Sequence, residues 1–246
     1  MQYHLSDFPL WENTSTTPTD PSDGFVLLVD KPLGWTSFDV VRRVRNLLSR
    51  QLHQKKLKVG HAGTLDPLAT GLMIVCVGKA TKIITEMTAY DKEYVAQMEL
   101  GRTTPSFDQE TRTDGVYPTD HIRREHIEEA AAGFIGDSMQ VPPLFSAKKI
   151  EGVRAYEFAR QGDDRTLDAQ RIHISDMELL TFEMPYATLR IRCSKGTYIR
   201  ALVRDLGRAL QTGACMTALR RTAIGPFRTE DAFQMDDLAR QIAMIV

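Results

Sequence analysis

Short apolar segments with two different periodicities follow one another along this chain without regular alternation, and this pattern restricts the fold more than any other feature. Residues 25–30 and 72–77 are almost continuously apolar, which is typical of buried strands, whereas residues 93–100 alternate between apolar and polar side chains. The order of the segments predicts an α+β fold rather than a doubly wound α/β fold. Further strands are expected at 140–149, 171–182, 187–194 and 219–227, and helices at 36–49, 79–89, 123–134, 154–160, 197–210 and 235–246.

The composition is that of an ordinary globular protein. The 246 residues suffice for one large domain, alone or with a small appendage, and 42% of them are hydrophobic and 26% charged. No apolar run approaches the roughly 20 residues that span a bilayer, and the N-terminus lacks the pattern of a signal peptide. Cys76, Cys193 and Cys215 are far apart in the sequence, which argues against a disulfide framework or a zinc site and predicts a cytoplasmic protein.

Two segments differ from the rest in composition. Residues 1–23 are rich in Thr, Ser, Pro and Asp and are predicted to form a flexible tail or a loosely docked arm. Residues 101–120 form a long polar connection, which is unusual inside a compact domain unless it acts as a lid or a binding loop. We therefore expect a core domain at 24–228 and a helical segment at 229–246.

A loop at residues 60–71 places Asp66 and His61 five positions apart among Gly, Thr and Pro, directly before the apolar run 72–77. Loops held by a rigid strand often carry chemistry. Asp66 can act as a nucleophile, a general base or a metal ligand, and His61 can act as an acid or a base. The alternative is a structured turn in which Asp66 caps its own backbone. No pair of histidines has metal-binding spacing, so no metal site is expected.

Two further constellations follow later in the chain. The segment 195–200 passes through a Gly turn into a predicted helix, where Arg200 can pair with a carboxylate. Tyr94 and Tyr198 each have a flat ring on which a nucleobase could stack. The alternatives are a helix cap and core aromatics. Leu219 with the two arginines that follow it is a weaker signal for a packing surface next to phosphate.

The charges are distributed unevenly although their formal sum is only −1. Residues 42–58 contain seven basic side chains and no acid, and residues 190–228 contain nine basic side chains against Asp205 alone. If the two segments share a face, that face could neutralise the phosphates of a nucleic acid. The alternative is that both are solvated helices.

Taken together, the ordered motifs of this chain resemble the bacterial TruB family, the tRNA pseudouridine-55 synthases, over about residues 25–227. Any single motif could arise by chance, but their order makes coincidence improbable. The motifs are Asp30-Lys31-Pro32-Leu33-Gly34-Trp35-Thr36-Ser37, the loop 60–71, Gly78-Lys79-Ala80-Thr81-Lys82, Asp91-Lys92-Glu93-Tyr94, Gln140-Val141-Pro142-Pro143, Ser146-Ala147-Lys148-Lys149, Gly196-Thr197-Tyr198-Ile199-Arg200 and Leu219-Arg220-Arg221.

The resemblance implies a pseudouridine synthase fold, with a central, mostly antiparallel mixed sheet flanked by helices. It implies an isomerase that detaches a uracil from its ribose, turns it and rejoins it through carbon 5, without a cofactor or a metal. The substrate is the T-arm of tRNA, bound by a monomer. A base inside a stem-loop has to be flipped out before an enzyme can reach it.

The resemblance also assigns roles to individual residues. Asp66 matches the catalytic aspartate, and Arg200 matches the arginine that pairs with it and favours its ionised form. Tyr94 matches the aromatic that stacks on the target base and takes part in catalysis, and Tyr198 matches the second active-site tyrosine. The remaining substrate-binding assignments are His61, Leu219 and Lys82.

Three questions stay open from the sequence. Many TruB-like proteins carry a further RNA-binding module, the PUA domain, and the roughly 20 residues after Phe227 are too few for it. The attack of Asp66 could be on the sugar or on the base. Rival functions are an RNA-binding or RNA-folding module without catalysis, and a synthase for another RNA.

Overall fold

The computed structural model describes residues 3–12, 23–54, 56–146, 148–150, 152–163 and 165–244. These residues form two compact units. The first unit comprises residues 1–93 and 220–246, and the second comprises residues 94–219. Strands β5 (Lys92–Leu100) and β13 (Ala214–Ile224) contribute residues to both units.

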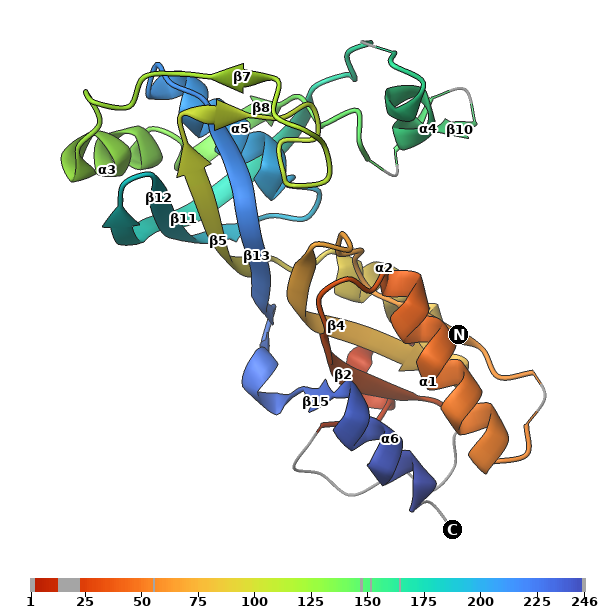
Figure 1. Ribbon diagram of the computed structural model, residues 1–246. Helices are drawn as coiled ribbons and strands as arrows, with labels where there is room; N and C mark the ends of the chain where they lie inside the picture. Colours follow the sequence, from red (N-terminus) through yellow and green to blue (C-terminus); the bar gives the residue numbers. More distant parts are fainter. Residues whose placement is uncertain are drawn as a thin grey trace. The chain divides into compact units, whose positions relative to one another are not determined.

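The first unit is built on buried strands in the order β1-β2-β4-β13 (Figure 1). Strand β2 (Phe25–Lys31) is buried along its whole length and runs antiparallel to β4 (Ala69–Val77), with Phe25 opposite Val77. Such strands read as continuous apolar runs because both of their faces are covered. Two short strands, β1 (Leu10–Trp11) and β15 (Phe233–Gln234), run parallel to β2. Two others are antiparallel to their neighbours: β3 (Val59–His61) pairs with β4, and β14 (Phe227–Arg228) pairs with β13.

Helix α1 (Ser37–Gln51) is the main helix of the first unit. Thr36 caps it, because its hydroxyl accepts a hydrogen bond from the Asp39 amide. Val40, Val44 and Leu48 form its buried stripe, and the helix lies against β3 and α6 (Met235–Ala243). The remaining elements are η1 (Leu5–Asp7), η2 (Gly78–Ile83), α2 (Ile84–Thr88) and η3 (Thr229–Asp231).

The second unit orders its strands β13-β5-β12-β11-β8. Strand β11 (Gln170–Glu183) is antiparallel to both β12 (Tyr186–Cys193) and β8 (Gly136–Gln140). The long helix of this unit is α5 (Ile199–Ala209), whose first turn carries Arg200. The other elements are β6 (Arg102–Thr103), β7 (Gly115–Val116), α3 (Arg124–Ala132), β9 (Lys149–Ile150), β10 (Val153–Arg154) and α4 (Ala155–Arg160).

The α+β prediction and the mostly antiparallel mixed sheet are confirmed. The prediction of a strand at 140–149 was wrong, since β8 ends at Gln140 and β9 begins at Lys149. Pro142 and Pro143 lie between them, and proline has no amide proton for a strand ladder. The helix expected at 79–89 divides into η2 and α2, and β13 begins five residues before Leu219.

The described residues of both irregular segments include paired strands. Of residues 1–23, the described part 3–12 is docked, because β1 pairs with β2 and Trp11 is fully buried. Residues 13–22 lie outside the described residues. In the segment 101–120, β6 pairs with β7, and the backbone of Asp108 forms an isolated parallel β-bridge with that of Met216.

Gly71 provides a test of the packing between β4 and β13. Its φ is +104°, and a Cβ at this position would lie 2.3 Å from the carbonyl oxygen of Arg221. Gly136 has a similar φ of +108° but no atom within 4 Å of such a Cβ. We expect Gly136→Ala to lower the free energy of unfolding by about 1–2 kcal/mol through backbone strain alone, and Gly71→Ala by at least about 1 kcal/mol more. Urea unfolding of both variants measures the difference, and equal losses would contradict the close approach.

Candidate functional site

The backbone before Asp66 is fixed by a buried serine. Ser37, in the first turn of α1, donates to the carbonyl of Leu65 at 3.0 Å and accepts from the Leu65 amide at 2.8 Å. The Ala69 amide closes the turn by donating to the carbonyl of Asp66 at 3.1 Å. Asp66 is half-buried at the end of this clamp, so α1 and β4 together determine where its carboxylate lies.

A buried lysine holds the other side of the same loop. The Lys31 ammonium is fully buried and donates to the carbonyls of Pro32 at 3.0 Å, Trp35 at 2.6 Å and Pro67 at 3.4 Å. Burial lowers the pKa of Lys31 from 10.5 to about 8, and the nearby negative charge of Asp66 opposes this shift. Lys31 therefore joins the turn after β2 to the loop of Asp66, both mechanically and electrostatically.

Arg221 braces the loop from β13. Its guanidinium is buried and donates to the carbonyl of Leu72 at 2.7 Å and to that of Gly63 at 3.1 Å. Burial, and then the charge of Arg221, lower the pKa of His61. Among the described residues, the buried Nδ1 atom of His61 has no hydrogen-bond partner. Both the burial and the neighbouring guanidinium therefore disfavour a cationic ring at this position.

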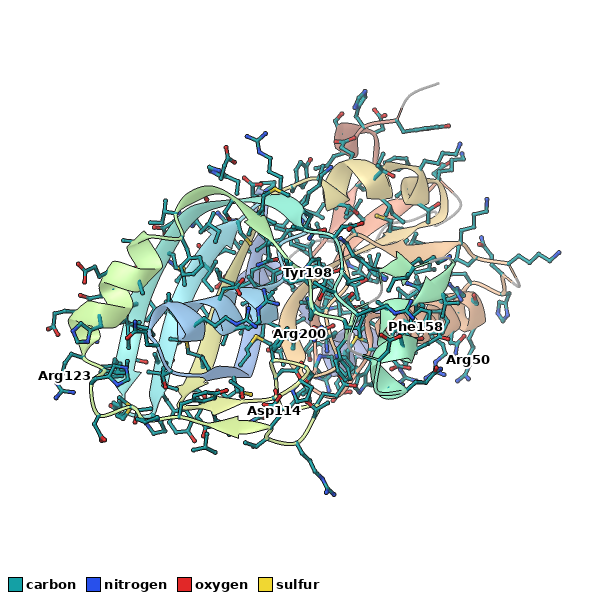
Figure 2. The ribbon with its side chains drawn as sticks, turned by 90° about the horizontal axis from the view of Figure 1, so that it is seen from above. Arg50, Asp114, Arg123, Phe158, Tyr198 and Arg200 are labelled. Carbon is teal, nitrogen blue, oxygen red and sulfur yellow. The ribbon has the colours of Figure 1, made fainter. Side chains whose placement is uncertain are left out.

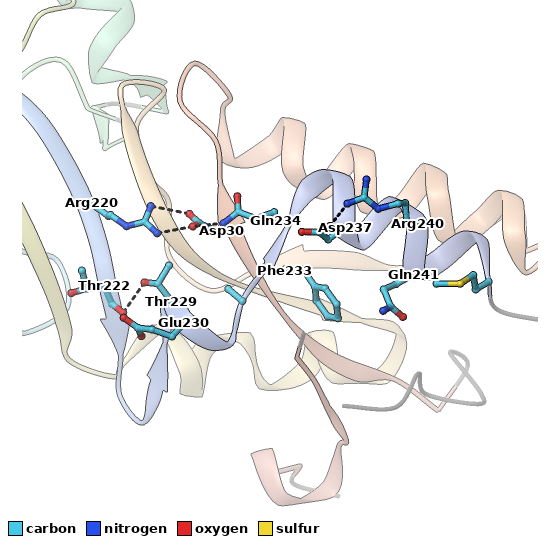
Figure 3. A pocket seen from close by; sticks show the side chains of 12 residues that line it. Asp30, Arg220, Thr222, Thr229, Glu230, Phe233, Gln234, Asp237, Arg240 and Gln241 are labelled. Carbon is cyan, nitrogen blue, oxygen red and sulfur yellow. Dashed lines mark hydrogen bonds and ion pairs between the residues drawn. The ribbon is translucent and has the colours of Figure 1, made fainter. Parts of the chain in front are cut away.

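The neighbouring arginine is engaged by a carboxylate (Figure 3). Arg220 binds Asp30 through two nitrogens, at 3.1 Å and 2.6 Å, and the side-chain amide of Gln234 donates to the same carboxylate at 2.8 Å. These residues lie in a cavity of about 700 Å³ whose wall includes both acids and bases of the C-terminal segment, among them Asp237 and Arg240. Arg221 is buried and serves internal contacts, whereas the side chain of Arg220 is 43% exposed beside its ion pair, so its interpretation as a phosphate ligand stays a prediction.

In the second unit, the side chain of Gln140 grips the residue that precedes α5. Its amide oxygen accepts from the Tyr198 backbone amide at 2.9 Å, and its amide nitrogen donates to the Tyr198 carbonyl at 3.1 Å. Gln140 is buried at the end of β8. Both main-chain groups of Tyr198 are therefore held by one side chain, which fixes the start of α5.

Arg200, the second residue of α5, is buried, and Figure 2 labels it together with Tyr198. It donates to the carbonyls of Ser106 at 3.0 Å and Phe145 at 2.8 Å, and its Nε lies 3.5 Å from Asp108. The hydroxyl of Ser106 in turn donates to Asp108 at 2.6 Å. The long connection 101–120 thus supplies the polar partners that allow a guanidinium to be buried.

The other predicted residues lie on regular elements. Tyr94 and Leu219 are buried on β5 and β13, at 8% and 7% exposure. Lys82 is exposed at the end of η2, with its ammonium 4.4 Å from the ring centre of Tyr3.

The predicted residues divide between the units: His61, Asp66 and Lys82 belong to the first, and Tyr94, Tyr198, Arg200 and Leu219 to the second. The predicted pairing of Asp66 with Arg200 stays a prediction. The sequence reasoning missed the supporting residues Lys31, Ser37, Asp108 and Gln140. A lysine that ends an apolar strand was the one signal that could have identified any of them.

No group of three or more His, Cys, Asp or Glu side chains in the described part of the chain could hold a metal ion. Among the same residues, no helix is long and apolar enough to cross a membrane.

Comparison with known families gives two matches that adjoin each other. Residues 49–199 match the profile described as "TruB family pseudouridylate synthase (N terminal domain)". Residues 200–245 match that of the "tRNA pseudouridylate synthase B C-terminal domain".

Similar proteins cover most of the chain. A tRNA pseudouridine synthase B of Phocaeicola vulgatus is 55% identical over 214 residues, which is 87% of this chain and 91% of that protein. One of Flavobacterium johnsoniae is 45% identical over 89% of this chain and 96% of the relative. Among solved structures, a chain in the crystal structure of a Cbf5–Nop10–Gar1 complex matches with a TM-score of 0.68 at 31% identity, covering 89% of this chain and 54% of that one.

Lys31 should give the stability of the protein a distinctive pH dependence. Since its pKa is about 8 when folded and 10.5 ordinarily, the unfolded chain binds more protons at this site between these values. The free energy of unfolding should therefore rise across this range, by about 3 kcal/mol from this group. Urea unfolding of wild type and Lys31→Met at a series of pH values measures it. Equal slopes in the two proteins would contradict the assignment.

Proposed function

The chain belongs to the TruB family of pseudouridylate synthases, and from this membership we propose that it isomerises the uridine at position 55, in the T-loop of tRNA. Formation of pseudouridine in tRNA is the activity of its curated relatives. The reaction breaks the bond between N1 of uracil and the sugar, and forms a bond between C5 and the same sugar carbon. A proton leaves C5 and N1 gains one, so no net oxidation takes place.

Asp66 is the residue that we assign to the chemistry. The supporting observation is its fixed backbone, held by Ser37 on one side and by the Lys31 ammonium on the other. Positioning of this kind lowers the entropy that a reaction has to lose at the moment of attack.

The second unit carries the groups that we assign to the flipped base. Tyr94 would stack on it, Tyr198 would face it from the start of α5, and Leu219 would form an apolar wall. Arg200 is held by Asp108 and two carbonyls, and we assign it to the carboxylate of Asp66 in the substrate complex. His61 and Lys82 would contact the RNA around the target.

The direct test is to incubate the protein with unmodified T-arm RNA and to map pseudouridine at each position. Pseudouridine at the T-loop uridine supports the proposal. Its appearance only in another RNA would assign a different substrate, and its absence from every RNA that the folded protein binds would favour a module without catalysis.

Asp66→Asn should abolish turnover and leave RNA affinity within a few-fold. The amide is nearly isosteric but cannot attack or carry the charge that the chemistry needs. Most of the affinity should come from phosphate contacts and the shape of the site. Single-turnover rates and equilibrium binding to T-arm RNA measure the two effects. Isomerisation at an appreciable fraction of the wild-type rate would overturn the assignment.

Two substitutions of Tyr94 separate stacking from packing. Tyr94→Phe keeps the ring, so RNA binding should stay nearly normal, and its turnover falls only if the hydroxyl takes the proton from C5. Tyr94→Leu should weaken binding by about 1–3 kcal/mol, since stacking is lost, and should also lose turnover. Binding, single-turnover rate and melting temperature are measured for both. A fully active Tyr94→Leu with only a lower melting temperature would make Tyr94 a core residue.

A further inference from the structure

The two basic segments of the sequence have different fates in the structure. Four arginines of the segment 190–228 are engaged within the protein: Arg200 with Asp108, Arg204 with Asp205, Arg220 with Asp30 and Arg221 with two carbonyls. An arginine whose charge is balanced by a neighbouring carboxylate contributes little to the attraction of a distant polyanion. These four are therefore mainly structural, whereas Arg192, Arg208 and Arg228 of the same segment are exposed.

The segment 42–58 is exposed instead. Helix α1 buries its valines and Leu48, which leaves Arg42, Arg43, Asn46 and Arg50 on the opposite side, and Figure 2 labels Arg50 there. We call these four residues, together with the exposed ring of Phe38, the α1 face. Lys56 and Lys58 continue the positive charge beyond the helix, and the sequence has no acidic residue from position 42 to 58.

The α1 face adjoins an acid, Asp39, whose carboxylate is already engaged. Asp39 accepts hydrogen bonds from the amide of Thr36 at 3.0 Å and from its hydroxyl at 2.6 Å, and Arg42 lies 2.7 Å away. The pKa of Asp39 is lowered, and its hydrogen bonds with Thr36 are the main cause. Asp39 therefore offsets part of the Arg42 charge and leaves that of Arg43 and Arg50.

A hollow of about 260 Å³ lies on the α1 face, lined by Trp35, Asp39, Arg42, Arg43 and Asn46. Two guanidiniums and an amide provide several N–H donors around this space, and the indole provides a flat apolar wall. Guanidinium groups bind phosphate oxygens in pairs of parallel hydrogen bonds. The hollow thus has the donors and the room for one phosphate group.

The hollow is connected to the loop of Asp66 through one buried group. The Lys31 ammonium binds the carbonyl of Trp35 at 2.6 Å and that of Pro67, the residue after Asp66, at 3.4 Å. The Gly34 amide adds a second link, donating to the Pro67 carbonyl at 2.9 Å. A strand of RNA that delivers a uridine to Asp66 therefore brings its neighbouring phosphates to the start of α1.

We propose that the α1 face binds the sugar-phosphate backbone of the substrate RNA, with one phosphate seated in the hollow between Arg42 and Arg43. This surface rests on the proposed function for the identity of its partner. It supplies affinity and orientation without reading sequence, since phosphate contacts position a nucleic acid and base contacts specify it.

The test compares two double variants that each remove two positive charges from exposed sites of the first unit. Arg42→Gln with Arg43→Gln removes the guanidinium donors of the hollow, and Arg228→Gln with Arg240→Gln is the matched control, since both of its arginines are exposed and neither lines the hollow. Fluorescence anisotropy of labelled T-arm RNA across a series of KCl concentrations measures Kd and its salt dependence. Circular dichroism and melting temperature verify that both variants are folded.

The α1 variant should raise Kd by about tenfold and lower the slope of log Kd against log salt by about 1, for the one phosphate in the hollow. The control should lie close to wild type. Unchanged binding in the α1 variant, or equal weakening in both variants, would overturn the proposal. So would an unchanged Kd with a slower single-turnover rate, because the arginines would then act on the loop of Asp66.

Failure of the proposed function would look different. In that case wild type forms no pseudouridine in T-arm RNA, while the salt dependence of binding still reports on the α1 face. If wild type forms pseudouridine in T-arm RNA but the α1 variant binds this RNA with the same Kd and salt dependence as wild type, only the proposal for the α1 face is rejected.

Discussion

The buried ammonium of Lys31 is the interaction on which the first unit depends. A charge in such a place is costly unless it is hydrogen-bonded and balanced. Three carbonyl oxygens accept hydrogen bonds from this ammonium. The negative charges of Asp30, Asp39 and Asp66 raise the pKa of Lys31, whereas the positive charge of Arg221 lowers it. The turn after β2 and the loop of Asp66 are consequently held to one group. Movement of either segment would leave a buried charge with fewer partners.

In the second unit, polar groups at the start of α5 are likewise held by hydrogen bonds from distant segments. The segment 140–145 supplies the side chain of Gln140 to the backbone of Tyr198, and its carbonyls at Val141 and Phe145 accept from Arg204 and Arg200. Pro142 and Pro143 have no amide protons that would need partners in this buried stretch. Residues from a strand end, a proline-rich turn and a helix thereby hold the two predicted site residues of α5.

The arginines of this chain have two different roles, although the formal net charge is only −1. Buried arginines such as Arg200 and Arg221 donate to carbonyls and hold loops in place. Exposed ones such as Arg43 and Arg50 leave their charge to solvent and to any polyanion that approaches. The same residue type therefore contributes stability in one place and long-range attraction in another. Only burial distinguishes the two, because it decides whether a guanidinium is screened by water or by protein dipoles.

The sequence by itself determined the α+β class, most strands and helices, and the loop that carries Asp66. Hydrophobic periodicity and turn residues are local properties, so they are legible without the fold. It also carried the family motifs, which the comparisons confirm. The folded structure adds that Arg220 pairs with Asp30 and that Arg221 braces the loop, that Lys31 and Ser37 hold the loop, and that Asp108 partners Arg200. These contacts join residues 28 to 190 positions apart, and no local pattern encodes which distant group a buried charge will meet.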